Sequence, residues 1–237
     1  GKCGWGRPHC FEIWAKQGAE TTAKNTADSI KNALVYYNWP EGVHFETYLQ
    51  GSYKNTTNIR GDSDIDVNCQ LTSVFKSNTK DFSENQLRLY DQIFSNATYN
   101  WTQFHGDVLL RLTKYFGNEN VKVGKKSIKI AGSSSRLPAD VVVSMNYRKF
   151  NRLIDNYDYS YVEGMIFFVP TENRWVVNYP KLHYENGVEK NDTNNTNGWF
   201  KPTVRILKNF RSYLVDNKLI DKKTAPSYFI ECLTYNI

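Results

Sequence analysis

The stretch from Tyr48 to Leu71, YLQGSYKNTTNIRGDSDIDVNCQL, decides how this chain is expected to fold. It opens with a short apolar and aromatic run, turns at Gly51-Ser52 and, after a polar spacer, alternates acidic with apolar residues. Successive side chains of a β-strand point to opposite faces, so Asp64 and Asp66 share one face while their apolar neighbours anchor the other face in a core. The pattern predicts two carboxylates held side by side on a strand.

Paired carboxylates raise each other's pKa and are costly unless a cation neutralises them. Mg²⁺ suits such a pair because it takes oxygen ligands and completes its shell with waters and substrate phosphates. The Gly51-Ser52 turn would let backbone N–H groups and a small hydroxyl approach a phosphate without a Cβ in the way. The pattern therefore favours a metal and phosphate site over a hairpin with an acidic solvent face. Asp62 falls on the same face, but we expect it to mark the start of the strand rather than to bind metal.

A strand followed by Gly-Ser, a spacer and an Asp-x-Asp strand resembles the signature of the DNA polymerase β-like nucleotidyltransferase superfamily. That resemblance implies an α+β fold, in which a palm with a mixed sheet packs against a helical lobe. It also implies a third carboxylate from a later strand, and the segment LPADVVV offers Asp140 for that place. Catalysis and the binding of two Mg²⁺ ions, or Mn²⁺ in their place, are assigned by the resemblance to Asp64, Asp66 and Asp140. Gly51 and Ser52 would grip the β- and γ-phosphates.

Within that superfamily, the chain resembles the CD-NTase family, the bacterial cyclic-oligonucleotide synthases related to cyclic GMP-AMP synthase and oligoadenylate synthase. The segments that carry the resemblance are GSYKNTTNIRGDSDIDV, LPADVVV, WFKPTVRILKNFRSYL and APSYFIECL. In that family a lysine on the late helix contacts the triphosphate, and a Ser-Tyr pair offers a hydroxyl to the phosphates and a ring to the base. The resemblance gives Lys208 the first role and Ser227 and Tyr228 the second. The residues alone leave an alternative for each position, because Lys208 could be a solvated surface lysine and Tyr228 could be a tyrosine of the core.

The resemblance implies an enzyme that joins nucleoside triphosphates into a cyclic di- or trinucleotide with release of pyrophosphate, in antiphage signalling. ATP is the expected substrate, with GTP and UTP as further candidates. The alternatives are a linear oligonucleotide or RNA-tailing enzyme, a nucleotidyltransferase acting on a protein or small molecule, and a nucleotide-binding module with a dead site. A regulatory protein partner stays open, whereas no zinc insertion or long basic arm supports activation by nucleic acid.

The composition is that of a globular protein. The chain has 237 residues, 40% of them hydrophobic and 23% charged, and a net charge of +6 that must lie away from the acidic site. No apolar run reaches the roughly 18 residues that a membrane span needs, so we expect no membrane association. We expect a reducing cytoplasm, with Cys69 and Cys232 as small buried side chains. Cys3 and Cys10 match no common zinc spacing, and we expect neither a metal site nor a disulfide there.

Apolar periodicity and turn residues place the other elements. The expected elements are, in order, an amphipathic helix from Thr21 that ends before Trp39-Pro40, helices over 81–117 with a break at 96–102, strands over 121–130, 161–169 and 174–178, a loop over 187–198, a helix opened by Lys201-Pro202, and a buried helix over 225–237. We assign residues 1–170 to the palm lobe with its N-terminal helix, and 171–237 to a helical C-terminal lobe that is expected to continue beyond Ile237.

Overall fold

A mixed β-sheet forms the centre of the molecule in the computed structural model, which describes residues 10–18, 20–59 and 64–237. The strands lie in the order β1-β2-β5-β4-β3, with β6 on the second half of β5 and β7 beside β6. Strands β2 and β5 are parallel, and the other described pairs are antiparallel. The strands are β1 (Phe45–Gln50), β2 (Ile65–Ser77), β3 (Val121–Val123), β4 (Ile128–Ile130), β5 (Ala139–Leu153), β6 (Tyr159–Val169) and β7 (Arg174–Asn178).

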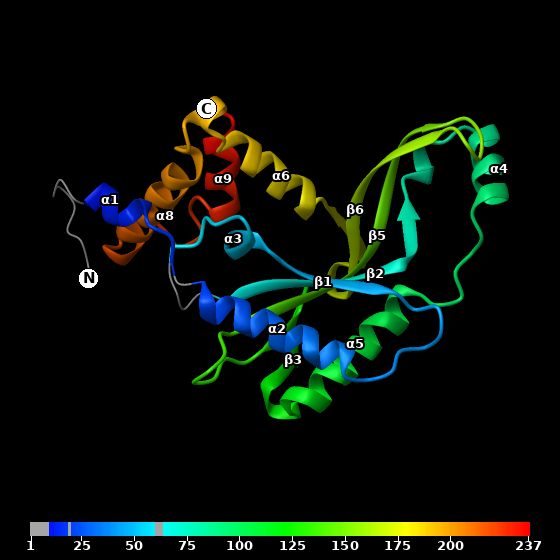
Figure 1. The fold of residues 1–237 in the computed structure, drawn as a ribbon, viewed down its shortest axis with the longest axis horizontal. Coiled ribbons are helices and arrows are strands. Elements are labelled where there is room, and N and C mark those ends of the chain that lie inside the picture. Colours follow the sequence, from blue (N-terminus) through cyan, green and yellow to red (C-terminus); the bar gives the residue numbers. More distant parts are fainter. Residues whose placement is uncertain (1–9, 19, 60–63) are drawn as a thin grey trace.

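Helices cover the sheet on both sides (Figure 1). Helices α2 and α5 lie below it in that view, whereas α6, α8 and α9 gather above it and to the left, with α3 between them and the sheet. The helices are α1 (Cys10–Ala15), α2 (Thr21–Val35), α3 (Gly51–Lys54), α4 (Glu84–Ile93), α5 (Trp101–Phe116), α6 (Pro180–Lys190), α7 (Thr193–Thr196), α8 (Phe200–Asp216) and α9 (Ser227–Tyr235). Single 3₁₀ turns lie at Thr79–Asp81, Asn118–Asn120 and Pro170–Glu172.

The alternation of β2 places the core on one face of the sheet. Val67, Cys69 and Leu71 are completely buried, and they belong to one hydrophobic cluster with the inward side chains of α2 and α5. Burying an apolar side chain of this size stabilises the fold by about 1.5–3 kcal/mol. Helix α5 starts where Asn100 accepts a hydrogen bond from the Gln103 amide, and Gln103 accepts one in return from the Asn100 amide. This capping box fixes the start of the helix that covers the core.

Helix α1 packs away from α2, against α8. Asn209 of α8 donates a hydrogen bond to the carbonyl of Trp14 at 3.0 Å, and the Trp14 ring lies 6.4 Å from that of Tyr213. Figure 1 shows α1 beside α8, while α2 runs along the sheet. The N-terminal segment therefore ties the helical part of the molecule to the sheet. The division of the chain at residue 170 stays a prediction.

Several expected elements are confirmed and two are wrong. The helix from Thr21, the broken helical region and the strand Arg174–Asn178 are present. The segment 121–130 is a hairpin rather than one strand, because Gly124 turns the chain and its amide donates to the Ser127 carbonyl. The segment 187–198 is not a loop. It holds the end of α6 and the short helix α7, which Asp192 caps by accepting from the Asn194 amide.

The last helix differs from the expectation in burial. In α9 the residues Ile230, Glu231 and Thr234 are buried, whereas the aromatic and aliphatic side chains of the opposite face are exposed. Of the cysteines, Cys69 is buried as expected, and Cys232 is partly exposed. Cys10 is disulfide-bonded, so the expectation that it forms no disulfide is wrong, and Cys3 lies outside the described residues.

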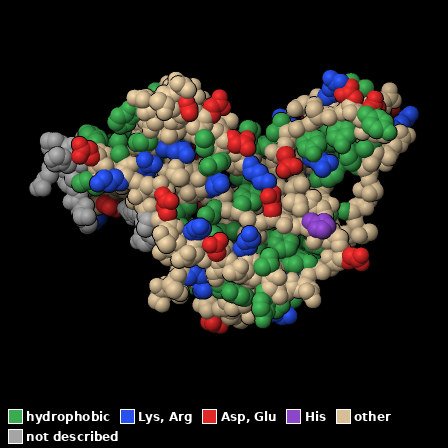
Figure 2. Space-filling view, viewed as in Figure 1, with side chains coloured by type: hydrophobic (Ala, Val, Ile, Leu, Met, Phe, Trp, Pro, Cys, Tyr) green, Lys and Arg blue, Asp and Glu red, His purple; other side chains and the backbone are tan. Residues whose placement is uncertain are grey.

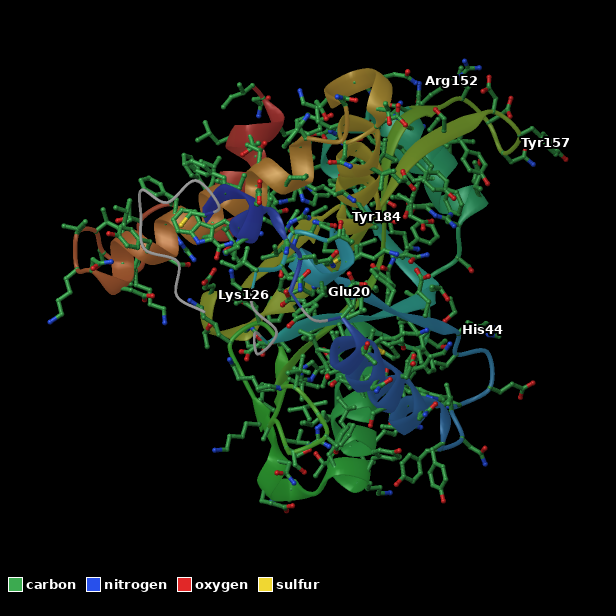
Figure 3. All side chains as sticks on the ribbon, turned by 60° about the vertical axis from the view of Figure 1, so that its left-hand side comes forward. Glu20, His44, Lys126, Arg152, Tyr157 and Tyr184 are labelled. Atoms are coloured by element: carbon green, nitrogen blue, oxygen red, sulfur yellow. The ribbon has the colours of Figure 1, made fainter. Side chains whose placement is uncertain are left out.

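The second half of β5 and β6 extends from the sheet as a long hairpin. Figure 3 shows Arg152 and Tyr157 at its far end, away from Tyr184 on α6. Aromatic side chains of the hairpin pack against α4, as in the pair Tyr90 and Phe150 at 5.9 Å between ring centroids. Among the helices of the described ranges, we find none with the length and apolar character that crossing a membrane requires.

Candidate active site

Four polar side chains form a row across the sheet, on the face opposite the core. Gln50 of β1 is paired with Asp66 of β2, Asp66 with Asp140 of β5, and Asp140 with Lys129 of β4. Directly paired residues of neighbouring strands project to the same side of the sheet. Two of the three predicted carboxylates are therefore brought together from segments more than 70 residues apart in the chain.

The environment of Asp66 shows that the carboxylates lie close together. Burial, together with the negative charges of Asp140 and Asp64, raises the pKa of Asp66 to about 6. Asp140 is half-buried and lies 3.6 Å from the ammonium of Lys129. At neutral pH the site thus holds more negative charge than its own neighbours balance, and a divalent cation would relieve that repulsion.

Asp64 is the most exposed of the three. It directly precedes β2, and the next residue, Ile65, is held against the later segment by a hydrogen bond from its amide to the Pro138 carbonyl at 3.0 Å. In the described ranges 10–18, 20–59 and 64–237, no three His, Cys, Asp or Glu side chains form a closed metal cluster by themselves. The donors are carboxylate oxygens, which suit Mg²⁺ completed by water and phosphate oxygens. Asp62, which we expected to be no ligand, lies outside the described residues.

Gly51 lies against the Asp66 carboxylate. Its φ is +66°, a left-handed conformation that favours glycine, and a Cβ at this position would overlap the Oδ2 atom of Asp66. The Gly-Ser turn is the first turn of α3, which starts directly after β1. The backbone of the predicted phosphate turn therefore passes within contact distance of Asp66, a predicted metal ligand, and a side chain at position 51 would require the Asp66 carboxylate to move.

A pocket of about 200 Å³ lies between the Gly-Ser turn and the helical part of the molecule. It brings together Ser52, Ser227 and Lys208, which were predicted to bind the phosphates, from α3, α9 and α8. Its lining comprises Ser52, Thr57, Asn58, Ile59, Lys208, Arg211, Ser212 and Ser227. Figure 2 shows basic and acidic side chains lying side by side across the middle of this face, between the helices at upper left and the strands at right.

Lys208 lies in the wall of this pocket and is almost completely buried. Its ammonium donates to the Thr57 carbonyl at 3.2 Å, to the Thr57 hydroxyl at 3.1 Å and to Glu231 at 2.5 Å. A lysine ammonium has three N–H donors, so these bonds use all of them. Lys208 is therefore not a solvated surface lysine, which was the alternative that the sequence left open. Its contact with a triphosphate stays a prediction.

Glu231 is the centre of a buried polar cluster. Burial alone would raise the pKa of Glu231, but hydrogen bonds from His183, Lys208 and Thr57, together with the Lys208 charge, outweigh it and lower the pKa to about 2. Asn55 donates a further hydrogen bond to the carboxylate at 3.4 Å. The cluster joins α6, α8 and α9 to the segment that follows the Gly-Ser turn. Nothing in the sequence pattern of α9 marked Glu231 as buried and paired.

Tyr228 is exposed at the start of α9, with its ring 5.4 Å from that of His183. Tyr228 is therefore not a tyrosine of the core, which was the alternative that the sequence left open. A role for its ring in stacking on a base stays a prediction.

Sequence reasoning did not single out Arg211 of α8, which also lines the pocket, although it lies three residues after Lys208 and therefore on the same face of the helix. That spacing was the signal that could have found it.

A mixed sheet with paired aspartates on neighbouring strands, beside a Gly-Ser turn, defines a nucleotidyltransferase of the polymerase β-like class. A family model for the "cGAS/DncV-like nucleotidyltransferase C-terminal helical domain" matches residues 185–237. A cyclic UMP-AMP synthase from Rhodothermus marinus (strain SG0.5JP17-172) is 51% identical over 229 residues, which span 96% of this chain and 75% of the relative. The cyclic nucleotide synthase CdnE01 from Staphylococcus haemolyticus is 38% identical over 230 residues, which span 96% of this chain and 75% of that relative.

Solved structures give the same result. The Rhodothermus marinus CdnE c-UMP-AMP synthase with Apcpp and Upnpp has a TM-score of 0.85 and 51% identity, covering 96% of this chain and 74% of that chain. The Elizabethkingia meningoseptica CdnE cyclic dinucleotide synthase with GTP and Apcpp has a TM-score of 0.74 and 28% identity, and the match covers 98% of this chain and 75% of that chain. The chain belongs to the CD-NTase family of nucleotidyltransferases, which confirms the predicted family and fold class.

Proposed function

We propose that this chain joins ATP and UTP into a cyclic dinucleotide in a Mg²⁺-dependent reaction that releases pyrophosphate. The observation that carries the proposal is the pairing of Asp66 with Asp140 beside Gly51. The choice of bases rests on the relative that is 51% identical and is named a cyclic UMP-AMP synthase. A tri- rather than dinucleotide product, and GTP as a substrate, remain alternatives that the same assay separates.

Each predicted site residue has a place in this reaction. Bound Mg²⁺ would neutralise the triphosphate and lower the pKa of the attacking hydroxyl, a role for which Asp64, Asp66 and Asp140 supply the oxygen ligands. In the proposed step the hydroxyl oxygen bonds to the α-phosphorus, the bond to pyrophosphate breaks, and Asp140 takes the proton. Lys129, at 3.6 Å, stabilises the negative charge of Asp140.

The nucleotide itself is held by the two turns that face each other across the 200 Å³ pocket. Gly51 leaves the backbone of the first turn open to the phosphates, and Ser52 adds a hydroxyl. Ser227 offers a second hydroxyl from the start of α9, and the exposed ring of Tyr228 is available to a base. Lys208 holds Thr57 and Glu231 in place behind these groups.

Product analysis tests the proposal. The chain is incubated with Mg²⁺ and labelled ATP and UTP, treated with phosphatase, and analysed by mass spectrometry. We expect a phosphatase-resistant product that is lost with EDTA and in Asp66→Asn, but not in Asp28→Asn, which alters an exposed aspartate of α2. A phosphatase-sensitive product would show a linear oligonucleotide maker, and no turnover with retained ATP binding would show a dead module.

The cellular role rests on family membership. We assign the product to antiphage signalling in the cytoplasm, with a regulatory protein partner left open. A plaque assay in bacterial cells that express the chain tests this role, since the wild-type chain should reduce plaque number and Asp66→Asn should not.

A further inference from the structure

The row of polar side chains on the sheet face opposite the core continues beyond Asp140. Asp140 of β5 is paired with Lys129 of β4, and Lys129 is paired in turn with Lys122 of β3. Directly paired residues of neighbouring strands project to the same side of a sheet, so both lysines share the face of the carboxylates. The row therefore ends in two adjacent cations at the β3–β4 edge of the sheet.

The two lysines repel each other, because like charges at directly opposite positions of paired strands are destabilising. Both side chains are exposed, and within the described residues Lys122 makes no ion pair and neither ammonium makes a hydrogen bond. The ammonium of Lys129 lies 3.6 Å from Asp140, which is too far for a hydrogen bond. The N–H donors of both lysines are thus available to an anion.

The proposed reaction brings two triphosphates to this row. The triphosphate of the donor nucleotide is expected on the β1 side, where Gly51 touches Asp66 and leads into the turn that would grip the phosphates. The attacking hydroxyl belongs to the ribose of the acceptor nucleotide and gives its proton to Asp140. That ribose carries a triphosphate of its own, which needs a place away from the first one because like charges repel.

The β3–β4 edge offers that place. It lies on the other side of the carboxylates from β1, since the strand order is β1-β2-β5-β4-β3. Lys122 is two strand spacings from Asp140, or roughly 10 Å, a distance that a ribose and its 5′ phosphates can bridge. A lysine ammonium is a compact charge on a flexible stem, so two of them can follow a phosphate chain without fixing one geometry.

We propose that Lys122 and Lys129 bind the triphosphate of the acceptor nucleotide while Asp140 receives its hydroxyl. The inference rests on the proposed function, since it requires two nucleotides in one site. The contact of Lys129 with Asp140 is long and partly exposed, so its ammonium can turn from the carboxylate to a phosphate. Lys122 makes no contact with the carboxylates that its removal would disturb, which makes it the cleaner position for a test.

Binding of a second nucleotide tests this role. The protein is loaded with one equivalent of Apcpp in Mg²⁺, and the affinity for Upnpp and for UMP is then measured by calorimetry on wild type, Lys122→Gln and the double variant K122Q/K129Q. We expect Lys122→Gln to weaken Upnpp about 3- to 10-fold and the double variant about 10- to 100-fold, because charge-assisted contacts to phosphates are lost. UMP should lose less than about 3-fold, since it lacks the terminal phosphates.

Two controls separate this effect from a general one. Lys24→Gln removes an exposed lysine of α2, on the other side of the sheet, and should match wild type. The affinity of every variant for the first equivalent of Apcpp should also stay that of wild type, because the donor nucleotide lies away from the β3–β4 edge. Thermal unfolding of each variant checks the fold independently.

Three outcomes decide against the inference. An unchanged affinity of the double variant for Upnpp would overturn the role of the lysines. An equal loss for Upnpp and UMP, or for the first equivalent of Apcpp, would overturn it as well, because the lysines would then act on the site as a whole. A wild-type chain that binds Apcpp but no second nucleotide would contradict the proposed function itself, and the inference with it.

Discussion

Asp66 and Asp140 occupy directly paired positions on the parallel strands β2 and β5, which makes two carboxylates neighbours across the sheet. Their mutual repulsion, added to burial, raises the pKa of Asp66 to about 6. The sheet face opposite the core therefore holds charge that the fold alone does not neutralise. A divalent cation shared with a triphosphate would supply the missing positive charge, and this would explain why the chain keeps such a costly pair.

The first prediction concerns the carboxylates themselves. Asp66→Asn and Asp140→Asn should each lower turnover by roughly 10³-fold or more, because each removes a carboxylate that we propose to bind the ions that stabilise the transferring phosphate. Asp28→Asn, at an exposed position of α2, serves as the matched control and should keep full activity. Initial rates of pyrophosphate release measure the effect, and wild-type rates in both site variants would refute the assignment.

A second prediction follows from the pKa of Asp66. Since its folded pKa of about 6 lies above 3.8, the ordinary pKa of an aspartate, the folded state binds more protons between these values. The free energy of unfolding of the metal-free protein should therefore fall as the pH rises through this window. By pH 8 the ionised Asp66 should have lowered it by about 3 kcal/mol. Urea unfolding in EDTA at pH 5 and pH 8 checks this. Asp66→Asn should be more stable than wild type at pH 8, and an equal difference at both pH values would contradict the prediction.

Two glycines test the close approach at the phosphate turn. Gly51→Ala should destabilise the fold by about 1–3 kcal/mol and abolish most activity, since it adds a side chain at a positive φ and against Asp66. Gly42 has a φ of +76° but open space around its missing Cβ. Gly42→Ala should thus share the backbone cost and keep its turnover per folded molecule. Equal loss of activity in both variants would show that backbone strain alone, and not contact with Asp66, explains the effect of Gly51→Ala.

The buried ion pair gives a fourth prediction. Glu231→Gln should destabilise the fold by about 3–5 kcal/mol, because it leaves the Lys208 ammonium buried without its counter-charge. The exposed pair of Arg88 and Glu84 on α4 is the comparison, and Glu84→Gln should cost less than about 0.5 kcal/mol. Chemical unfolding measures both. A cost for Glu231→Gln as small as that for Glu84→Gln would mean that the Lys208 ammonium is not dependent on this carboxylate.

The motif region could be predicted from the sequence because its signal is local. The alternation of acidic and apolar residues around Asp66 sets the faces of β2, and the run of valines that follows Asp140 predicts the strand β5. Asp140 was placed by the family resemblance, which requires a third carboxylate at the start of a later strand. The capped helix α5 and the amphipathic helix α2 were predictable because their signals are local as well.

Long-range polar pairing could not be predicted. The burial of Lys208 depends on Glu231, which is 23 residues away in sequence on another helix. A helix pattern gives the face of each side chain but not its partner across the interface. The hairpin at 121–130 was missed for a different reason, since VKVGKKSIKI alternates through the turn and only Gly124 marks the reversal.

The most direct test of the central claim is a crystal structure with Mn²⁺ and Apcpp, in which anomalous scattering locates the metal. We predict metal at about 2.1 Å from oxygens of both Asp66 and Asp140, with Asp64 beside them and the triphosphate running over Ser52. Metal or nucleotide bound elsewhere, with Asp140 still paired only to Lys129, would contradict the account.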